Sequence, residues 1–435
     1  MPSHTEVDAG IEEPRVKRPE RTQVEFRACC WNDLLPDDHP ARTVWQYVES
    51  LDLSSIYGQI KAVEHRPGQP AIDPRILFAL WLYACLRGIG SARELDRRCS
   101  QQTGEVAFQW ICGGVSVNYH TLADFRTEHV DFLDQLLTNS VAVLMQEKLV
   151  TLDRVAQDGM KVRASAGAAS FRRGPTLEEC LAEATQQIEA LKKELDSDPA
   201  AGNLRQKAAR ERAARERAER IAKAIEEFKE VEKKKSADEK EKARASTTDP
   251  DAHVMKGPDG GYRPSYNVQL GTDTATQIIT AVDVSTSGGD QGQMAPMVHQ
   301  IEDRYGKAPD EMLVDGGFAK KDDITEVSAP QGSTTVYAPV QKSKKVDVDP
   351  HQPRDDDSQA VAEWRKRMAT DEAKKIYKER AATAECVNAI ARNRGLYQVR
   401  VRGRPKVMAV VLWYVLAHNL MRAVALRAEK QNQTE

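Results

Sequence analysis

The chain has 435 residues, of which 40% are hydrophobic and 30% are charged, and its formal net charge is −3. This composition is typical of a soluble protein with two or three domains and a large core. A balance so close to neutrality carries no overall signal of nucleic-acid binding, so any basic surface must be local. The seven cysteines form no Cys-x-x-Cys pair, which argues for reduced thiols and against a structural zinc site.

The chain begins with a charged, proline-containing segment, residues 1–23, for which we predict a flexible tail. This segment has no apolar stretch of the kind found in secretory signals. From about residue 24 the sequence turns globular, and three stretches show helical signals: 73–90, 91–102 and 119–149. We therefore predict an all-helical domain over residues 24–150 that serves DNA binding or dimerisation.

Two of these helices have recognisable starts. Asp73-Pro74 is a favourable helix N-terminus, and Ser91 with Glu94 has capping-box spacing. The pair also fits a helix-turn-helix, although most such pairs are ordinary packing units. Arginines are the candidate DNA contacts of this region, although each is more often a solvated surface charge: Arg66, Arg75, Arg87, Arg93, Arg97 and Arg98.

The sequence changes character after this domain. Residues 152–165 predict a short strand with Asp158-Gly159 at its turn. Residues 176–246 are rich in Ala, Glu, Lys and Arg, carry two apolar seams and break at an Asp-Pro pair. This pattern predicts an antiparallel helical hairpin or coiled coil inserted into whatever the strand began, as an arm for dimerisation or DNA contact.

Strand signals resume after the hairpin. We predict a β-hairpin, a helix, a strand that stops at Asp315, another helix, a further strand and a closing helix, over 266–287, 290–306, 312–314, 318–327, 333–340 and 359–394. The fold class is therefore α/β, with a mixed sheet flanked by helices, built from residues 151–175 and 247–428. The apolar run 407–426 contains His418, Asn419 and Arg422, which favours a buried helix over a membrane span.

Three carboxylates stand out as candidate catalytic groups. Asp158 and Asp315 are each followed by glycine at the end of a predicted strand, and Glu385 lies on the closing helix. Each Asp-Gly alone is more often a structural turn, and we assign Asp283 and Asp290 to structural roles. Three converging carboxylates suit two Mg²⁺ or Mn²⁺ ions and an in-line phosphoryl transfer that requires no protein nucleophile.

A basic segment follows Glu385. No acidic residue occurs from Cys386 to Ala428, and positive side chains crowd its first half: Arg392, Arg394, Arg400, Arg402, Arg404 and Lys406. Glu385 and Arg392 are seven residues apart, hence on one helix face, which suits a helix lying along a nucleic-acid backbone. The alternative is a solvated amphipathic helix with a basic tail, in which Arg380 is an ordinary surface charge.

Several blocks of the chain carry a resemblance to a known family. They are RPGQPAIDPRILFALWLYACLRGIGSARELDRRC (66–99), FQWICGGVSVNYHTLADFR (108–126), QDGMKVRASA (157–166), SYNVQLGTD (265–273), LVDGGFAKKDDI (313–324) and YKERAATAE (377–385). Over residues 25–425 the chain resembles the DDE transposases of bacterial insertion sequences. The resemblance implies an RNase H-like catalytic domain that is split by an insertion.

The resemblance also implies roles for single residues. Asp158, Asp315 and Glu385 match the family's metal-binding acids, and Tyr377 and Arg380 match the Tyr and Arg of its Tyr-Arg-Glu-Lys signature, which hold transposon-end DNA. Many relatives have three residues between that Arg and the Glu, whereas this chain has four. In place of the closing Lys this chain has Arg392.

The implied function is a transposase that cuts and rejoins DNA at the terminal inverted repeats of its own element with two Mg²⁺ or Mn²⁺ ions. The implied partners are double-stranded DNA, at the transposon ends and the target, and a second copy of the chain. The implied location is the bacterial cytoplasm, at the nucleoid, with no membrane and no small-molecule substrate. The alternatives are a structure-selective nuclease of the same fold, and a catalytically inactive DNA-binding or coiled-coil scaffold protein.

Overall fold

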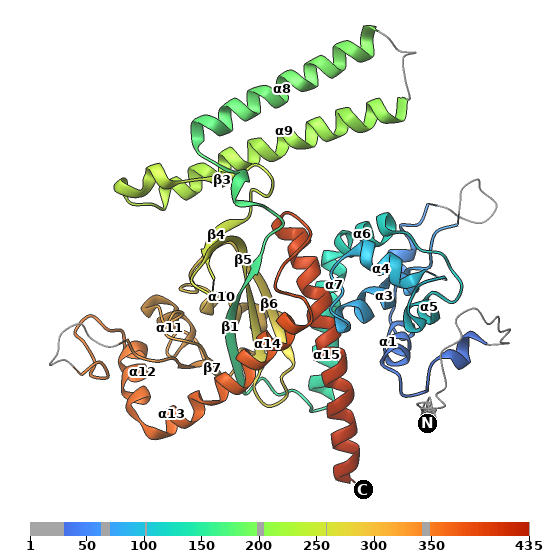
Figure 1. Cartoon of the computed structure of the whole chain (residues 1–435). Coiled ribbons are helices and arrows are strands. Elements are labelled where there is room, and N and C mark those ends of the chain that lie inside the picture. The colour runs from blue at the N-terminus through green and yellow to red at the C-terminus, as the bar shows by residue number, and fades with distance from the viewer. Residues whose placement is uncertain are drawn as a thin grey trace, which may run out of the picture.

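The computed structural model describes residues 30–61, 70–100, 102–197, 204–257, 259–341 and 349–434. Figure 1 shows three parts: a group of N-terminal helices, a domain built on a β-sheet, and a long two-helix hairpin that projects from the sheet domain. The mixed α/β class with an all-helical N-terminal part and a helical insertion, as predicted from the sequence, is confirmed.

The N-terminal part is helical throughout its described residues. It contains the 3-10 turn η1 (Trp31–Leu34) and the helices α1 (Pro40–Glu49), α2 (Ser54–Tyr57), α3 (Pro74–Leu86), α4 (Ala92–Cys99), α5 (Val106–Cys112), α6 (Tyr119–Glu128) and α7 (Val130–Gln146). Asp73 and Ser91 accept backbone N–H bonds at the starts of α3 and α4, as their spacing predicts. The predicted helix 119–149 is broken into α6 and α7 at His129, whose backbone is not helical (φ −116°, ψ 40°).

The C-terminal helix α15 (Arg404–Thr434) joins the N-terminal helices to the sheet domain. It contacts α3, α6, α7 and the sheet, and its side chains belong to one hydrophobic core that runs through both parts. The Trp413 ring lies 4.5 Å from that of Phe78, between centroids, and its Nε1 donates to the backbone oxygen of Arg126. By length and composition α15 could span a membrane, yet 78% of its most apolar window is buried, so it is the buried helix predicted from the sequence.

The sheet is mixed and six-stranded. Its strands are β1 (Arg154–Arg163), β4 (His253–Lys256), β5 (Tyr262–Asp273), β6 (Ile279–Ser285), β7 (Glu311–Leu313) and β8 (Thr335–Tyr337). On one side β1 pairs antiparallel with β5, whose far edge carries β4 and β6. On the other side β1 pairs parallel with β7, which pairs parallel with β8. The strand that carries Asp158 is therefore central in the sheet.

The predicted turn at Asp158-Gly159 is wrong. Both residues lie in the middle of β1, which pairs with β5 without interruption from Val155 to Arg163. Glycine is required at 159 by close packing, because a Cβ there would lie 2.3 Å from an Asp290 carboxylate oxygen. The Asp158-Gly159 dipeptide, which predicts a turn from the sequence, lies in a closely packed strand.

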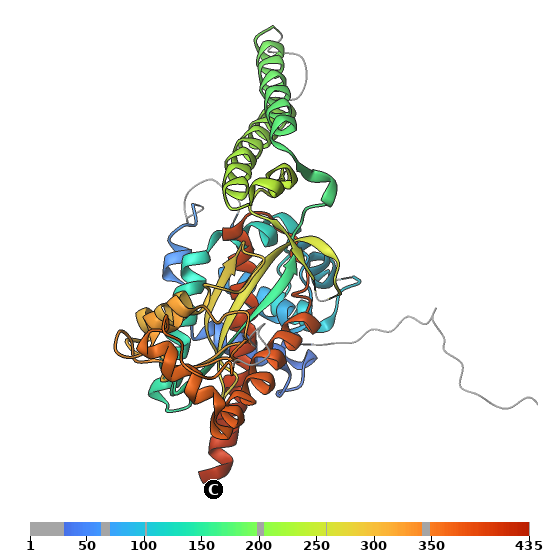
Figure 2. The same ribbon diagram turned by 90° about the vertical axis from the view of Figure 1, so that its left-hand side faces the viewer.

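Helices cover the sheet domain (Figures 1 and 2). They are α10 (Met294–Tyr305), α11 (Lys321–Val327), α12 (Gln359–Ala369), α13 (Asp371–Tyr377), the π-helix η4 (Ala381–Glu385) and α14 (Cys386–Asn393). The closing helix predicted over 359–394 is thus divided. Its last part runs through η4 directly into α14, which brings Glu385 toward β1.

The inserted hairpin consists of α8 (Gly174–Ser197) and α9 (Leu204–Lys233), which pack side by side and stand away from the body in both views (Figures 1 and 2). The short antiparallel pair β2 (Phe171–Arg172) and β3 (Ala245–Ser246) closes its base, flanked by the 3-10 turns η2 (Ala168–Ser170) and η3 (Ala237–Lys242). Leu177 of the first predicted seam is buried in a cluster with Ala224 and Ala245, and Ile225 and Phe228 of the second seam pack against this cluster.

Candidate active site

The sheet places Asp158 and Asp315 beside each other. Ala156 of β1 pairs with Leu313 at the end of β7, and each aspartate follows two residues after its member of this pair. Because the two strands are parallel, Asp158 in the middle of β1 and Asp315 just beyond the end of β7 lie at the same level. Glu385 comes from the other direction, at the end of η4, which contacts both β1 and β5.

The guanidinium of Arg380 contacts all three acids. Its Nη2 lies 3.1 Å from Asp158 Oδ1 and 3.8 Å from Asp315 Oδ2, and its Nη1 lies 3.2 Å from Glu385 Oε1. Arg380 is only 8% exposed, so this cation lies inside the site. The structure therefore brings together the three acids that the sequence singles out, around one of the two residues expected to hold DNA.

Further donors fix the two aspartates. Asn388 Nδ2 donates to Asp158 Oδ2 at 2.9 Å, and the Gly159 N–H donates to Asp158 Oδ1. The Gly317 N–H donates to Asp315 Oδ1 at 2.7 Å. Sequence reasoning missed Asn388. Its signal was present, because Asn388 follows Glu385 by three residues and so shares its helix face.

Burial dominates the electrostatics of the site. It raises the pKa of Asp158 above its ordinary value, although Arg380 and the hydrogen bonds from Gly159 and Asn388 oppose the shift, and Asp315 adds to it. Burial also raises the pKa of Tyr377, whose hydroxyl stays neutral beside the acids. The site thus holds negative charge in partly desolvated surroundings, where a bound cation is attracted strongly.

The π-helix accounts for the extra residue between Arg380 and Glu385. Residues four apart lie on one face of an α-helix, whereas residues five apart point to different sides. In a π-helix the repeat widens to i→i+5, and such turns often occur at functional sites. Because Ala381–Glu385 adopts this conformation, Arg380 and Glu385 face each other in spite of the longer spacing.

The donor chemistry of the site fits a divalent metal ion. Carboxylate oxygens are the ligands that Mg²⁺ and Mn²⁺ prefer, and Asp158, Asp315 and Glu385 already converge on one cation. Within the described residues, however, no group of three acidic, histidine or cysteine side chains stands close enough to hold an ion. The guanidinium of Arg380 lies between the carboxylates. Its nitrogen atoms are 3.1, 3.8 and 3.2 Å from the oxygens of Asp158, Asp315 and Glu385, whereas a Mg²⁺–oxygen bond is roughly 2.1 Å long.

Comparison with known families gives two matches. Residues 29–128 match the model "Transposase domain (DUF772)", and residues 242–420 match "Transposase DDE domain". The second match contains Asp315 and Glu385. The chain belongs to the DDE transposases of insertion sequences. Searches of curated proteins and of solved structures returned no match.

Membership of this family identifies the fold of the sheet domain, and the strand pairing adds β1 to the matched residues. The mixed sheet of the transposase is the RNase H-like fold of the family. Strand β1, with Asp158, lies outside both matched ranges, because the hairpin separates it from residues 242–420. Its pairing with β5 and β7 nevertheless makes it the centre of the matched domain.

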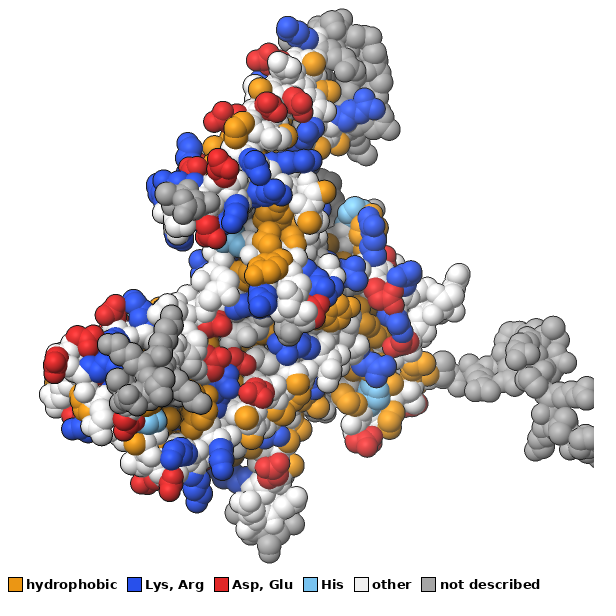
Figure 3. Space-filling model, turned by 60° about the vertical axis from the view of Figure 1, so that its left-hand side comes forward, with side chains coloured by type: hydrophobic (Ala, Val, Ile, Leu, Met, Phe, Trp, Pro, Cys, Tyr) orange, Lys and Arg blue, Asp and Glu red, His pale blue; other side chains and the backbone are white. Residues whose placement is uncertain are grey.

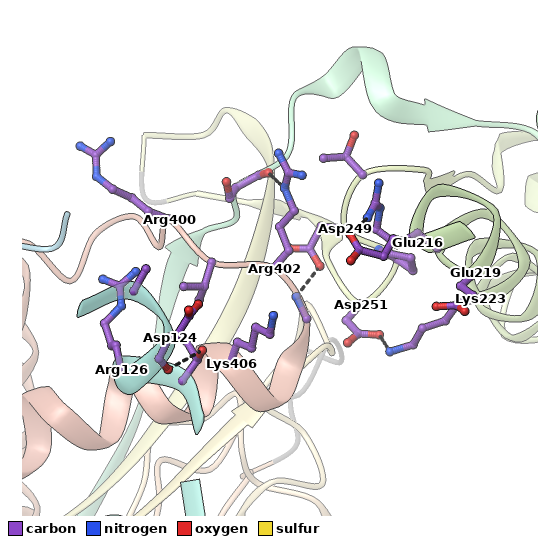
Figure 4. Close-up of a pocket in the computed structure, with 18 residues that line it drawn as sticks. Asp124, Arg126, Glu216, Glu219, Lys223, Asp249, Asp251, Arg400, Arg402 and Lys406 are labelled. Carbon is purple, nitrogen blue, oxygen red and sulfur yellow. Dashed lines mark hydrogen bonds and ion pairs between the residues drawn. The ribbon is translucent and has the colours of Figure 1, made fainter. Parts of the chain in front are cut away.

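The basic segment of the transposase is anchored to β1. The Arg163 N–H donates to the Tyr397 oxygen and the Val399 N–H to the Arg163 oxygen, so residues 397–399 lie along the end of the strand. From there exposed cations enter a polar cleft of about 780 Å³ between the hairpin, α6 and the start of α15. Figure 4 shows Arg400, Arg402 and Lys406 on one side of this cleft, and Glu216 and Lys223 of α9 on the other.

The other members of the basic segment lie elsewhere. Arg392 is exposed on α14, and Arg404 is paired with Asp283 at 3.0 Å. Arg394 is half-buried beside Tyr414 and His418, in a small apolar cavity away from the cleft. Figure 3 shows acidic and basic side chains interleaved over the hairpin, in keeping with the nearly balanced charge of that segment.

Two acids outside the site have structural partners, as the sequence suggests. Asp283 bonds Arg404, as described above. Asp290 accepts hydrogen bonds from Asn267 and Gln269 and pairs with Lys161, on the face of β1 that carries Gly159. The expected helix cap at Asp290 is wrong, since α10 begins only at Met294.

The N-terminal arginines are engaged within their own domain. Arg97 and Arg98 pair with Glu94, Arg87 lies 4.0 Å from Glu105, Arg75 donates to Tyr57, and Arg93 lies over the Tyr119 ring. Arg66 lies outside the described residues. These five arginines are exposed or half-exposed at the surface, where rearrangement toward a phosphate costs little.

Proposed function

We propose that this transposase cleaves DNA at the terminal inverted repeats of its element and joins the freed ends to target DNA, with two Mg²⁺ or Mn²⁺ ions held by Asp158, Asp315 and Glu385. The observation that carries the proposal is the convergence of these acids, from the central strand, the end of β7 and the end of η4, on one cation. Divalent ions at such a site polarise a phosphate and activate the attacking oxygen.

The reaction needs no covalent intermediate with the chain. In cleavage, a water oxygen replaces the 3′-oxygen at the end phosphate and leaves a 3′-hydroxyl. In transfer, that hydroxyl attacks a target phosphorus and releases a new 3′-hydroxyl. The carboxylates orient the reacting groups, Asn388 and the Gly317 N–H orient the carboxylates, and Tyr377 and Arg392 flank them for contact with the neighbouring phosphates.

The proposed DNA path runs from the acids toward the cleft. Arg402 Nε donates to the Ser165 backbone oxygen, seven residues beyond Asp158 in β1 and its extension. At about 3.3 Å per residue this separation is roughly 23 Å, or about seven base pairs of B-DNA. Arg400, Arg402 and Lys406 are therefore placed for phosphates about seven base pairs from the cleaved bond, while Arg404 contributes only after releasing Asp283.

Part of this proposal concerns partners and location. We infer that the transposase acts as a homodimer on double-stranded DNA in the bacterial cytoplasm, at the nucleoid, and that the hairpin serves dimerisation or DNA contact. Since β2 and β3 pair at its base, residues 173–244 can be replaced by an Asn-Gly turn without separating the strands. Unchanged oligomeric state and unchanged end binding after this replacement would remove the role of the hairpin.

The test of the catalytic proposal is cleavage of a duplex that carries the terminal repeat, with and without Mg²⁺. We expect Asp158→Asn and Asp315→Asn to lose cleavage, while the matched control Asp322→Asn, whose side chain is 82% exposed on α11, retains it. Cleavage that persists in either active-site variant contradicts the proposal. Hydrolysis without strand transfer would indicate a structure-selective nuclease.

A further inference from the structure

The cation inside the acid cluster belongs to the chain itself. Within the described residues, the ion pairs of Asp158, Asp315 and Glu385 are all made with Arg380. One guanidinium thus compensates three carboxylates, two of which share its Nη2. One positive charge cannot neutralise three carboxylates. The cluster therefore keeps a net negative charge, which attracts further cations.

The hydrogen bonds of the Arg380 guanidinium go to two of these acids, from Nη1 to Glu385 and from Nη2 to Asp158. Its Nε is buried and has no hydrogen-bond partner in the described structure. The neighbouring Glu379 is held by Arg154, whose Nη1 donates to Glu379 Oε2 at 2.6 Å. Arg380 thus stands between a residue paired with β1 and the start of η4, and its guanidinium reaches the acids from there.

We propose that Arg380 is a positioning residue that takes the place of the divalent cations in the metal-free transposase and leaves this place when they bind. The inference rests on the proposed metal-dependent function. Arg380 holds the carboxylates in position but keeps them too far apart to coordinate an ion. A guanidinium that stayed between them would also be repelled by the incoming charge.

The displaced guanidinium has a natural second partner in the DNA backbone. Arginine binds phosphate through two parallel N–H bonds, and such charge-assisted pairs are among the strongest hydrogen bonds in proteins. A phosphate that draws Arg380 away from Asp158 and Glu385 frees these acids. DNA binding and cation binding then favour each other, by the same factor in both directions.

The experiment measures Mn²⁺ affinity of the full chain without DNA, by electron paramagnetic resonance or calorimetry. Removing the competing guanidinium in Arg380→Gln is expected to tighten Mn²⁺ binding about tenfold or more, within the usual range of coupling between sites. The matched control Lys375→Gln, an exposed cation on α13 five residues before Arg380, is expected to bind Mn²⁺ like the wild type. Unchanged or weaker Mn²⁺ binding by Arg380→Gln overturns the inference.

Two further variants keep the result interpretable. Arg380→Lys retains a charge but not the fork that bridges several carboxylates, so its Mn²⁺ affinity is expected to lie between those of the wild type and Arg380→Gln. It decides the matter if Arg380→Gln does not fold; affinity equal to or below that of the wild type then overturns the inference. Asp158→Asn distinguishes the displacement of Arg380 from the metal site itself. Undiminished Mn²⁺ affinity in that variant refutes the metal site of the proposed function.

Discussion

Asn388 donates a hydrogen bond of 2.9 Å from Nδ2 to Asp158 Oδ2, on the oxygen that Arg380 does not contact. Both residues are largely buried, so this bond orients the carboxylate in partly desolvated surroundings. Partners that orient a metal-binding carboxylate typically contribute about 10–100-fold to metal affinity or activity. We expect Asn388→Ala to lower the rate of end cleavage by about that factor, measured under single-turnover conditions, with the far-UV spectrum unchanged.

An exposed neighbour serves as the control for this prediction. Asn393, at the end of α14, is exposed and has no role in the site, so Asn393→Ala is expected to cleave at the wild-type rate. Equal rates for Asn388→Ala and the wild type would show that Asp158 is oriented without its amide partner.

Asp158 should make folding stability depend on pH. Because burial raises its pKa in the folded chain, the folded state binds this proton more tightly than the unfolded state does. Its contribution to stability is present at low pH and is lost as the pH rises through the folded-state pKa. The neutral amide introduced by Asp158→Asn does not ionise and avoids this loss. We therefore expect Asp158→Asn to raise the Tm at pH 7 in EDTA, by a few degrees or less.

The difference should shrink as the pH falls, and vanish near the unfolded-state pKa of about 3.9. Paired thermal melts of the two proteins from neutral to acid pH measure it. A Tm advantage that grows toward acid, or a variant less stable than the wild type at pH 7, would contradict the assigned direction.

Deleting one residue of the π-helix η4 should convert it to an α-helix and keep Arg380 and Glu385 in contact. Ala381 is exposed, and the structure gives its side chain no contact with the acids. Deleting it brings Arg380 and Glu385 to a spacing of four residues, at which an α-helix places them on one face. We expect the deletion variant to fold and to cleave DNA within about tenfold of the wild type.

The opposite change provides the contrast. An added alanine after Ala381 places Arg380 and Glu385 six residues apart, a spacing that neither helix type aligns, so cleavage should fall far more than in the deletion variant. Equal loss in both variants, with both folded, would mean that the π-turn itself is required.

The sequence singled out three acids that lie together in the fold, but it did not predict the contacts around them. Asp315 and Glu385 could be found because each stands at a recognisable junction, a strand end or a helix beside basic residues. The mid-strand position of Asp158 was mistaken for a turn, since Asp-Gly has the same local signal in both settings. The contact of Arg380 with three acids depends on tertiary packing and on a π-turn, which no local pattern reveals.

The packing at Gly159 offers a test of the strand assignment. A Cβ at this position would lie 2.3 Å from Asp290 Oδ1 and 2.6 Å from Gln269 Nε2, inside a polar cluster on the face of β1 opposite Asp158. Gly159→Ala must displace these side chains, and we expect a loss of about 1–3 kcal/mol in the free energy of unfolding, with reduced cleavage. Denaturant melts measure the first effect.

Gly167 is the matched control, because a Cβ there meets nothing within 4 Å. Gly167→Ala is expected to be neutral or slightly stabilising, since it reduces the entropy of the unfolded chain. If Gly159→Ala were equally harmless, Asp158-Gly159 would not lie in the crowded strand described above.

A pre-cleaved transposon end tests whether Asp158, Asp315 and Glu385 carry out strand transfer. A labelled terminal-repeat duplex with a free 3′-hydroxyl is incubated with a plasmid target, Mg²⁺ and the full chain, beside the same duplex ending in a 3′-deoxy sugar. We expect covalent joining of the first duplex to the plasmid, none with the second, and none with Glu385→Gln. Joining that survives Glu385→Gln, or plasmid nicking without any joined product, would contradict it.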